Sequence, residues 1–277
     1  MSKLNQKIVK TFCRDYKNGL SSTAIGKLYG FPSTTVKRIL NRNGIQLRTL
    51  SAASSWMSIN PFKDLSSDEV QYWLGYIASD GSISKPGPKY RVNISTNENK
   101  GLHLEKYAKF LGNIYKVHQY WNKNYSCWEY SLNFCNKEIH TYLCSLGLVP
   151  QKSLILEMNI PLTWGFVRGV LDGDGTVVIA NKSSTSKGRP RIGFATGSIK
   201  FKNQLLKFLS NCGLHPTITV QHAGEGRLNP LYSINICRFN EIKKIYYFLY
   251  NNATVFLERK QLKFGLNLQE CKKEITL

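Results

Sequence analysis

Two short segments of the sequence each end in an aspartate at the place where a helix least favours negative charge. Residues 73–81 are WLGYIASDG and residues 167–175 are VRGVLDGDG, with Asp80 and Asp174 next to the final glycines. A carboxylate at the C-terminal end of a helix costs about 0.3 to 1 kcal/mol, and two neighbouring carboxylates repel each other. A divalent cation removes both penalties, because hard oxygen ligands suit Mg²⁺. We predict that Asp80 and Asp174 bind Mg²⁺ or Mn²⁺; solvated aspartates at glycine-rich helix ends are the alternative.

The two segments belong to an internal repeat. Residues 90–112 match residues 190–213, each a predicted strand followed by an amphipathic helix, and residues 130–143 match residues 232–249 in the same way. Two chance motifs would not be followed by matching flanks, so the chain is a duplication.

Small residues lie four positions apart on one face of each glycine-rich helix, Gly75 with Ser79 and Gly169 with Gly173. Such a face lets two helix backbones approach closely, at a cost in helix propensity of up to about 1 kcal/mol per glycine. Packing the two copies face to face across a pseudo-two-fold axis brings the two aspartates together. A capping box at Ser66 and a proline at position 161 predict where the two helices begin.

The charge balance points to a polyanionic partner. The 277 residues contain 38 Lys and Arg against 17 Asp and Glu, a net charge of +21, and such self-repulsion is best offset by nucleic acid. A membrane partner is disfavoured, because no apolar run reaches the roughly 18 to 20 residues of a bilayer span. The polar N-terminus does not resemble a secretory signal, and seven cysteines without a C-x-x-C pair predict an intracellular, reducing compartment.

Alternation of polar and apolar residues predicts strands with one polar face. Val92 and Ile94 alternate with Arg91 and its polar neighbours, and residues 114–121, 191–194 and 231–237 repeat the pattern. Two basic loops, residues 84–91 and 181–191, occupy equivalent places in the repeat. We expect these faces and loops to contact nucleic acid; solvated sheet surface is the alternative for any one residue. The predicted contacts are Lys85, Lys89, Arg91, Asn93, Ser95, Lys116, His118, Lys182, Lys187, Arg189, Arg191, Ser233 and Asn235.

The first 50 residues predict three short helices. Ser21 or Ser22 caps the second helix, Gly30 allows a tight turn, and Pro32 opens the third. The outer face of the third helix carries side chains suited to phosphates and base edges, Ser33, Thr34, Lys37 and Arg38.

Residues 21–45, SSTAIGKLYGFPSTTVKRILNRNGI, resemble the helix-turn-helix of resolvase- and transposase-like proteins, although Pro32 replaces the usual capping Ser or Thr. An ordinary helical hairpin is the alternative. The Ser- and Ala-rich stretch that follows contains Arg48 and is predicted to be a linker that lies along DNA.

The paired acidic segments resemble the LAGLIDADG motifs of homing endonucleases, and residues 248–260, FLYNNATVFLERK, resemble the end of that family's second repeat. The similarity covers roughly residues 66–264. It implies an α-β-β-α-β-β-α fold for each repeat and two sheets that form a saddle over DNA. It also implies that Asp80 and Asp174 bind metal at the two scissile phosphates, with the carbonyls of Ser79 and Gly173 as further ligands.

The predicted fold class is therefore α+β, with two αββαββα repeats after a small all-α domain. The predicted domains are a helix-turn-helix (1–50), a linker (51–65), a first repeat (66–158) and a second repeat (159–277). The predicted function is metal-dependent, site-specific cleavage of double-stranded DNA by a monomer. Each aspartate would serve mainly one strand, and Lys152 and Lys260 are the candidate catalytic lysines. The alternatives are a maturase that binds intron RNA and a non-catalytic DNA-binding regulator.

Overall fold

The structure is a computed structural model that describes residues 6–18, 20–47, 59–87, 89–97, 101–180, 189–222, 224 and 228–272. Side chains are described throughout these ranges except at positions 180, 189, 266, 267 and 269–272. The chain divides into two compact units, Met1–Trp56 and Met57–Leu277. Three predicted DNA contacts, Arg48, Lys182 and Lys187, lie outside the described residues, as does the side chain of Arg189.

The first unit contains the three predicted helices, α1 (Gln6–Lys17), α2 (Ser22–Tyr29) and α3 (Ser33–Arg42). Ser21 caps α2 by accepting a hydrogen bond from the Ala24 N–H at 3.0 Å, and Gly30 ends α2 with a left-handed φ of 73°. Pro32 precedes α3 without a side-chain cap. A small apolar core holds the helices together, formed by Phe12, Tyr16, Ile25, Val36 and Leu40.

The second unit is the duplicated α+β fold that the sequence predicted. The first repeat contains, in order, α5 (Asp68–Ser79), β1 (Gly81–Ile83), β2 (Arg91–Thr96), α6 (Leu102–Phe110), β3 (His118–Asn122), β4 (Cys127–Cys135) and α7 (Lys137–Ser145). The second repeat contains α8 (Trp164–Asp172), β5 (Thr176–Ala180), β6 (Arg189–Thr196), α9 (Ile199–Asn211), β7 (Thr217–Gln221), β8 (Leu231–Ile236) and α10 (Phe239–Tyr250). A 3-10 turn, η2 (Lys152–Leu154), follows α7 in the first repeat, and α11 (Glu258–Lys272) follows α10 in the second.

Each repeat forms one antiparallel sheet, ordered β1-β2-β4-β3 in the first and β5-β6-β8-β7 in the second. One face of each sheet is buried, because Val92 and Ile94 in the first and Ile192 and Phe194 in the second pack into a common core with the helices. The predicted period of two is confirmed, since the residues that alternate with these point to the opposite, polar face.

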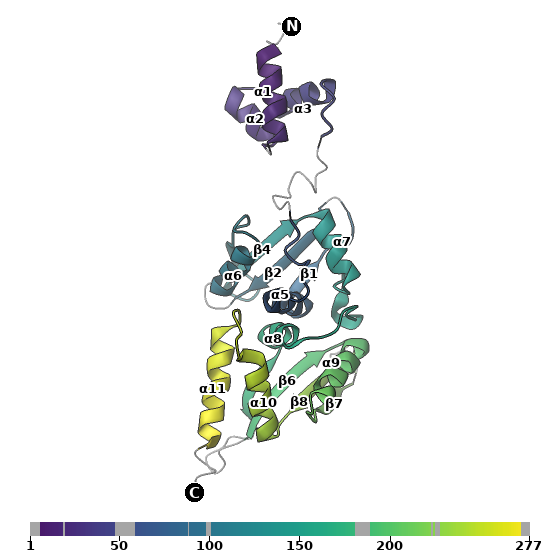
Figure 1. Cartoon of the computed structure of the whole chain (residues 1–277), viewed down its shortest axis with the longest axis vertical. Coiled ribbons are helices and arrows are strands. Elements are labelled where there is room, and N and C mark those ends of the chain that lie inside the picture. The colour runs from purple at the N-terminus through teal and green to yellow at the C-terminus, as the bar shows by residue number, and fades with distance from the viewer. Residues whose placement is uncertain are drawn as a thin grey trace. The chain divides into compact units, whose positions relative to one another are not determined.

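Helices α5 and α8 pack side by side between the two sheets (Figure 1). A Cβ atom added at Gly75 would lie 2.0 Å from the Phe166 carbonyl oxygen, and one added at Gly169 would lie 2.1 Å from the Tyr72 carbonyl oxygen. The predicted close approach of the two helix backbones is therefore confirmed. Gly165, one turn earlier in α8, also lies at this contact, although it is not among the residues identified from the sequence: an added Cβ there would lie 2.8 Å from the Asp68 carbonyl oxygen.

The starts of α5 and α8 differ slightly from the predicted ones. Ser67 rather than Ser66 caps α5, since the Ser67 hydroxyl oxygen accepts from the Val70 N–H at 3.5 Å, while the Ser66 hydroxyl donates to Asp64 at 2.6 Å. Helix α8 begins at Trp164, where the Thr163 hydroxyl oxygen accepts from the Phe166 N–H at 3.2 Å, so Pro161 lies before the helix.

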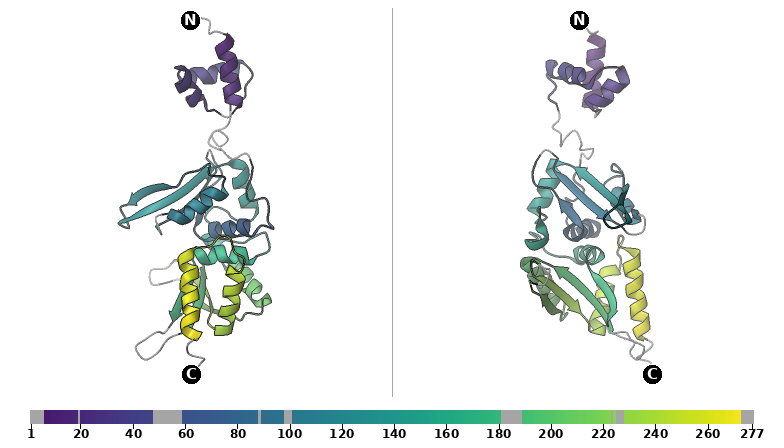
Figure 2. Two further views of the ribbon diagram at one scale, coloured as in Figure 1. Left: turned by 60° about the vertical axis from the view of Figure 1, so that its left-hand side comes forward. Right: turned by 180° about the vertical axis from the view of Figure 1, so that it is seen from behind.

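Part of the predicted linker belongs to the core of the second unit, since Phe62 is fully buried there. In the left view of Figure 2, the β3–β4 hairpin extends beyond the helices of its own repeat. Among the described residues, no helix is long and apolar enough to cross a bilayer. The six cysteines with described side chains are free thiols.

Candidate active site and nucleic-acid interface

The two predicted metal-binding aspartates lie together at the C-terminal ends of α5 and α8. Asp80 is the C-terminal capping residue of α5, and Asp174 follows the C-terminal capping residue of α8, Gly173. The helices converge so closely here that a Cβ added at Gly173 would lie 2.0 Å from the Ser79 hydroxyl oxygen and 3.3 Å from the Asp80 carboxyl carbon. The close packing of glycines thus brings together two acids that are 94 positions apart.

The electrostatics of this pair are unfavourable without a cation. Burial raises the pKa of the Asp80 carboxyl to about 6, the neighbouring Asp174 charge raises it further, and Lys260 opposes the shift. Asp174 itself is solvent-exposed. A divalent cation would relieve this repulsion, because its charge reverses the local electrostatics.

The donor set fits a magnesium-like ion that keeps most of its waters. The described residues contain no group of three or more His, Cys, Asp or Glu side chains that could enclose a metal. Mg²⁺ is usually bound by one or two carboxylates together with water and substrate phosphates, which is the set that Asp80 and Asp174 offer. The Ser79 hydroxyl is turned toward its own helix, donating to the Tyr76 carbonyl at 3.1 Å. Gly173 uses its carbonyl to accept from Lys260 at 2.8 Å.

The two candidate lysines occupy equivalent positions. The Lys152 ammonium donates to the Gly81 carbonyl, and the Lys260 ammonium donates to the Gly175 carbonyl at 2.8 Å; each glycine follows the aspartate of its own repeat. Both lysines are buried. Burial lowers the pKa of the Lys152 ammonium, and the charges of Asp174 and Asp80 oppose that shift. All four predicted catalytic side chains therefore gather at one end of the helix pair.

Lys260 makes more contacts than Lys152. Its ammonium also lies 2.7 Å from the Leu171 carbonyl, 2.8 Å from the Asp172 carbonyl and 2.8 Å from the Gly173 carbonyl. These carbonyls belong to the last turn of α8, which leaves them without partners inside the helix. An ammonium has three N–H groups, so Lys260 can donate hydrogen bonds to the carbonyls at the C-terminal end of α8. It also places a positive charge beside the two aspartates.

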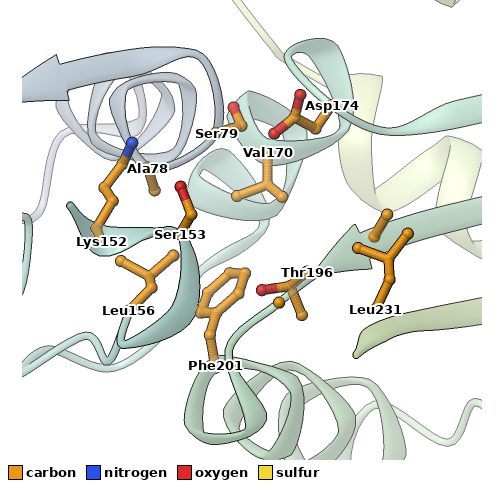
Figure 3. A pocket seen from close by; sticks show the side chains of 12 residues that line it. Ala78, Ser79, Lys152, Ser153, Leu156, Val170, Asp174, Thr196, Phe201 and Leu231 are labelled. Atoms are coloured by element: carbon orange, nitrogen blue, oxygen red, sulfur yellow. The ribbon is translucent and has the colours of Figure 1, made fainter. Parts of the chain in front are cut away.

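A cleft of about 330 Å³ opens beside Asp174, between α5, the η2 turn and β6 (Figure 3). In this view Lys152 and Asp174 stand on either side of Ser79, and Phe201 and Leu156 line the opposite wall. A second cleft of about 290 Å³ runs from Asp174 along the polar face of the second sheet, past Arg191, Ser233 and Asn235. The candidate metal site is therefore continuous with the polar surface of that sheet.

The polar faces carry the other predicted DNA contacts. In the first repeat Arg91, His118, Lys116, Lys85 and Lys89 are exposed, and Asn93 and Ser95 are half-buried. In the second repeat Arg191 is exposed. In the first unit Thr34, Lys37 and Arg38 are exposed on α3, and Ser33 is half-buried.

Strand pairing places two further polar residues, Glu129 and Thr219, next to predicted DNA contacts, although the sequence did not single them out. Glu129 lies opposite Tyr120 in the first sheet, and Thr219 lies opposite Ser233 in the second. Hydrogen bonds from Asn122 and Tyr120 hold the pKa of the Glu129 carboxyl below its usual range. The alternation of polar and apolar residues can be seen in the sequence at these positions, but the residues that lie opposite them on the neighbouring strand cannot.

Comparisons with known proteins agree with this geometry. Residues 162–246 match the model of the LAGLIDADG-like domain. The homing endonuclease I-WcaI bound to its DNA recognition sequence superposes with a TM-score of 0.50 and 15% identity, over 76% of this chain and 88% of that one. The homing endonuclease I-GzeII in complex with its DNA target gives a TM-score of 0.50 and 13% identity, over 79% and 93%.

The full-length DUF199/WhiA protein from Thermatoga maritima gives a TM-score of 0.47 and 12% identity, over 78% of this chain and 64% of that one. No curated protein sequence matches the chain. The second unit thus has the LAGLIDADG fold, and its second repeat matches the LAGLIDADG-like domain in sequence.

Proposed function

We propose that this protein is a site-specific DNA endonuclease of the homing type, which cuts both strands of a long target with a divalent metal. The observation that carries the proposal is the meeting of Asp80 and Asp174 at the ends of α5 and α8. The pair lies beside a cleft that continues along a polar sheet face. The two superposed homing endonucleases, which were each solved with DNA, support the same assignment.

Each part of the site has a role in this reaction. Asp80 and Asp174 would hold the metal, and a divalent metal bound there would polarise the scissile phosphate and help to activate water. Lys152 and Lys260 place positive charge next to the carboxylates. Arginines such as Arg91 and Arg191 on the two polar faces bind phosphates, and their polar neighbours contact base edges. The net charge of +21 favours encounter with DNA.

The protein acts as a monomer on an asymmetric site. Both carboxylates and both sheets come from one chain, and the two sheet faces differ in sequence, with Asn93 paired to Asn133 where Gly193 is paired to Asn235. The first unit extends the target by placing Lys37 and Arg38 of α3 on DNA, which adds affinity through a second linked contact. The free thiols fit action in a reducing compartment inside the cell.

A cleavage assay tests this function. The substrate is DNA that spans the uninterrupted insertion site of the gene, with Mg²⁺, with Mn²⁺ and with EDTA. The variants are Asp80→Asn, Asp174→Asn and the control Glu157→Gln, which changes an exposed surface carboxylate to an amide. We expect metal-dependent double-strand cleavage that the control retains and that either site variant loses or reduces to nicking. Tight binding with no cutting in either metal would overturn the proposal and favour a regulator.

A further inference from the structure

A buried polar cluster joins two charged residues of α8, Arg168 and Asp172, to Tyr72 of α5. Arg168 and Asp172 are separated by one turn of α8 and are 1% and 2% exposed. The Tyr72 ring of α5 lies between them, with the Arg168 guanidinium carbon 5.3 Å from the ring centre. The Tyr72 hydroxyl donates to Asp172 Oδ2 at 2.9 Å. Two charged side chains are therefore buried around one tyrosine, in the part of α8 that precedes Asp174.

The same two charged residues hold the connection between α10 and α11. Arg168 Nε donates to the Val255 carbonyl at 2.9 Å, and Asp172 Oδ2 accepts from the Leu257 N–H at 2.7 Å. Two side chains from one face of α8 thus bind the backbone of this connection, Arg168 at Val255 and Asp172 at Leu257.

This connection leads directly to Lys260. The Lys260 N–H donates to the Leu257 carbonyl at 2.9 Å in the first turn of α11, so the position of Leu257 sets where the lysine side chain begins. From there the ammonium reaches back to the carbonyls of Gly173 and Gly175, the two neighbours of Asp174. A closed path of contacts runs from Asp172 through Leu257 and Lys260 to the backbone that carries Asp174.

The first repeat is built differently. When Asp80 is aligned with Asp174, Leu74 and Ala78 stand where the second repeat has Arg168 and Asp172. Its lysine, Lys152, comes from the short η2 turn and donates to a single carbonyl, that of Gly81. Each half of the site therefore contains one lysine and one aspartate, but the two lysines are held by different numbers of hydrogen bonds.

We propose that Asp172 is a positioning residue, which acts through Leu257 to fix Lys260 against the Asp174 loop and so makes the two half-sites unequal. The inference rests on the proposed nuclease function. Removing the Asp172 carboxylate slows cleavage of the DNA strand that depends on Lys260 and leaves cleavage of the other strand largely unaffected. Burying a carboxylate costs free energy, and the hydrogen bonds that Asp172 accepts from Tyr72 and from the Leu257 N–H offset part of that cost.

Strand-resolved cleavage tests the proposal. Substrates labelled on either strand are cut by Asp172→Ala, which removes the oxygen that Leu257 bonds, by Lys260→Met, by Lys152→Met and by the double variant Asp172→Ala/Lys260→Met. We expect Asp172→Ala to change the ratio of the two strand rates by about tenfold, which corresponds to about 1.4 kcal/mol. The slowed strand is the same as in Lys260→Met and opposite to that in Lys152→Met. The double variant is no slower on that strand than Lys260→Met, because the two residues act in one path.

Controls separate positioning from loss of stability. Gln204→Ala removes a side chain that bonds both the N–H and the carbonyl of Met158, away from the cluster, and leaves the strand ratio unchanged even where it lowers the melting temperature. Tyr72→Phe removes the hydroxyl that donates to Asp172 and produces a smaller change of ratio in the same direction, which keeps the test available if Asp172→Ala folds poorly. Equal slowing of both strands, or full additivity in the double variant, overturns the proposal.

A second measurement does not depend on cleavage. Lys260 is only 5% exposed, so an amine-acylating reagent labels it slowly in the intact protein. Mass spectrometry of the labelled protein gives the labelling rate of each lysine. We expect Asp172→Ala to raise the Lys260 labelling rate about tenfold while the Lys152 rate stays constant. An unchanged Lys260 rate overturns the positioning role, whereas a raised rate in a protein that cuts no DNA rejects the nuclease function alone.

Discussion

The close packing of α5 on α8 gives a sharp prediction for Gly169→Ala. The added Cβ would lie 2.1 Å from the Tyr72 carbonyl oxygen, 2.6 Å from the Tyr76 nitrogen and 3.0 Å from the Gly75 carbonyl carbon. All three are backbone atoms of a buried helix, so no side chain can rotate away and the helices must separate.

The magnitude follows from two opposing effects. Overpacking a tight interior costs about 1 to 3 kcal/mol, and contact with rigid backbone places this site at the upper end of that range. Alanine is a better helix former than glycine by about 1 kcal/mol, which offsets part of the cost. We expect the free energy of unfolding to fall by about 2 kcal/mol, and cleavage to fall as well because separated helices move Asp80 away from Asp174.

Denaturant unfolding of the full chain measures the effect, with Gly265→Ala as the matched control. Gly265 lies inside α11, and an added Cβ there would be 3.5 Å from the nearest atom outside its own turn, the Tyr246 hydroxyl oxygen. This second glycine-to-alanine change should therefore keep or raise stability by up to about 1 kcal/mol. If Gly169→Ala were as stable as Gly265→Ala and cut DNA normally, the link between helix approach and site geometry would be refuted.

Three further outcomes are expected. Burial, with a smaller contribution from Lys106, lowers the pKa of His103 from 6.5 to about 3. The folded state therefore binds fewer protons than the unfolded state below pH 6.5. The free energy of unfolding then decreases as the pH is lowered, by about 2 kcal/mol at pH 5. His103→Gln should make the free energy of unfolding less dependent on pH in denaturation curves measured between pH 7 and 5. Arg191→Ala should weaken binding similarly on all DNA sequences and reduce the slope of log affinity against log salt by about 1, whereas an unchanged slope would exclude a phosphate contact. Substituting Lys37 and Arg38 with Ala should lower affinity for the full target while leaving the metal dependence of cleavage intact, and equal affinity would place α3 away from DNA.

The sequence alone determined the features that depend on local spacing. The duplication, the period of two in the strands and the small residues four apart in two helices are all visible in neighbouring residues. They were enough to predict the α+β class, the pairing of the two helices and the meeting of Asp80 with Asp174. A helix or strand has a fixed repeat, so the residues on one face can be identified without knowing what covers it.

Only the tertiary structure decided which distant groups meet. Asp172 differs from its counterpart Ala78, but its partner Leu257 is 85 positions away, and no periodicity connects the two. Lys260 was selected by its place in a motif, whereas its contacts with four carbonyls at the end of α8 depend on where α11 folds back. Hydrogen bonds to backbone carbonyls leave no pattern in the sequence, because every residue offers the same carbonyl group.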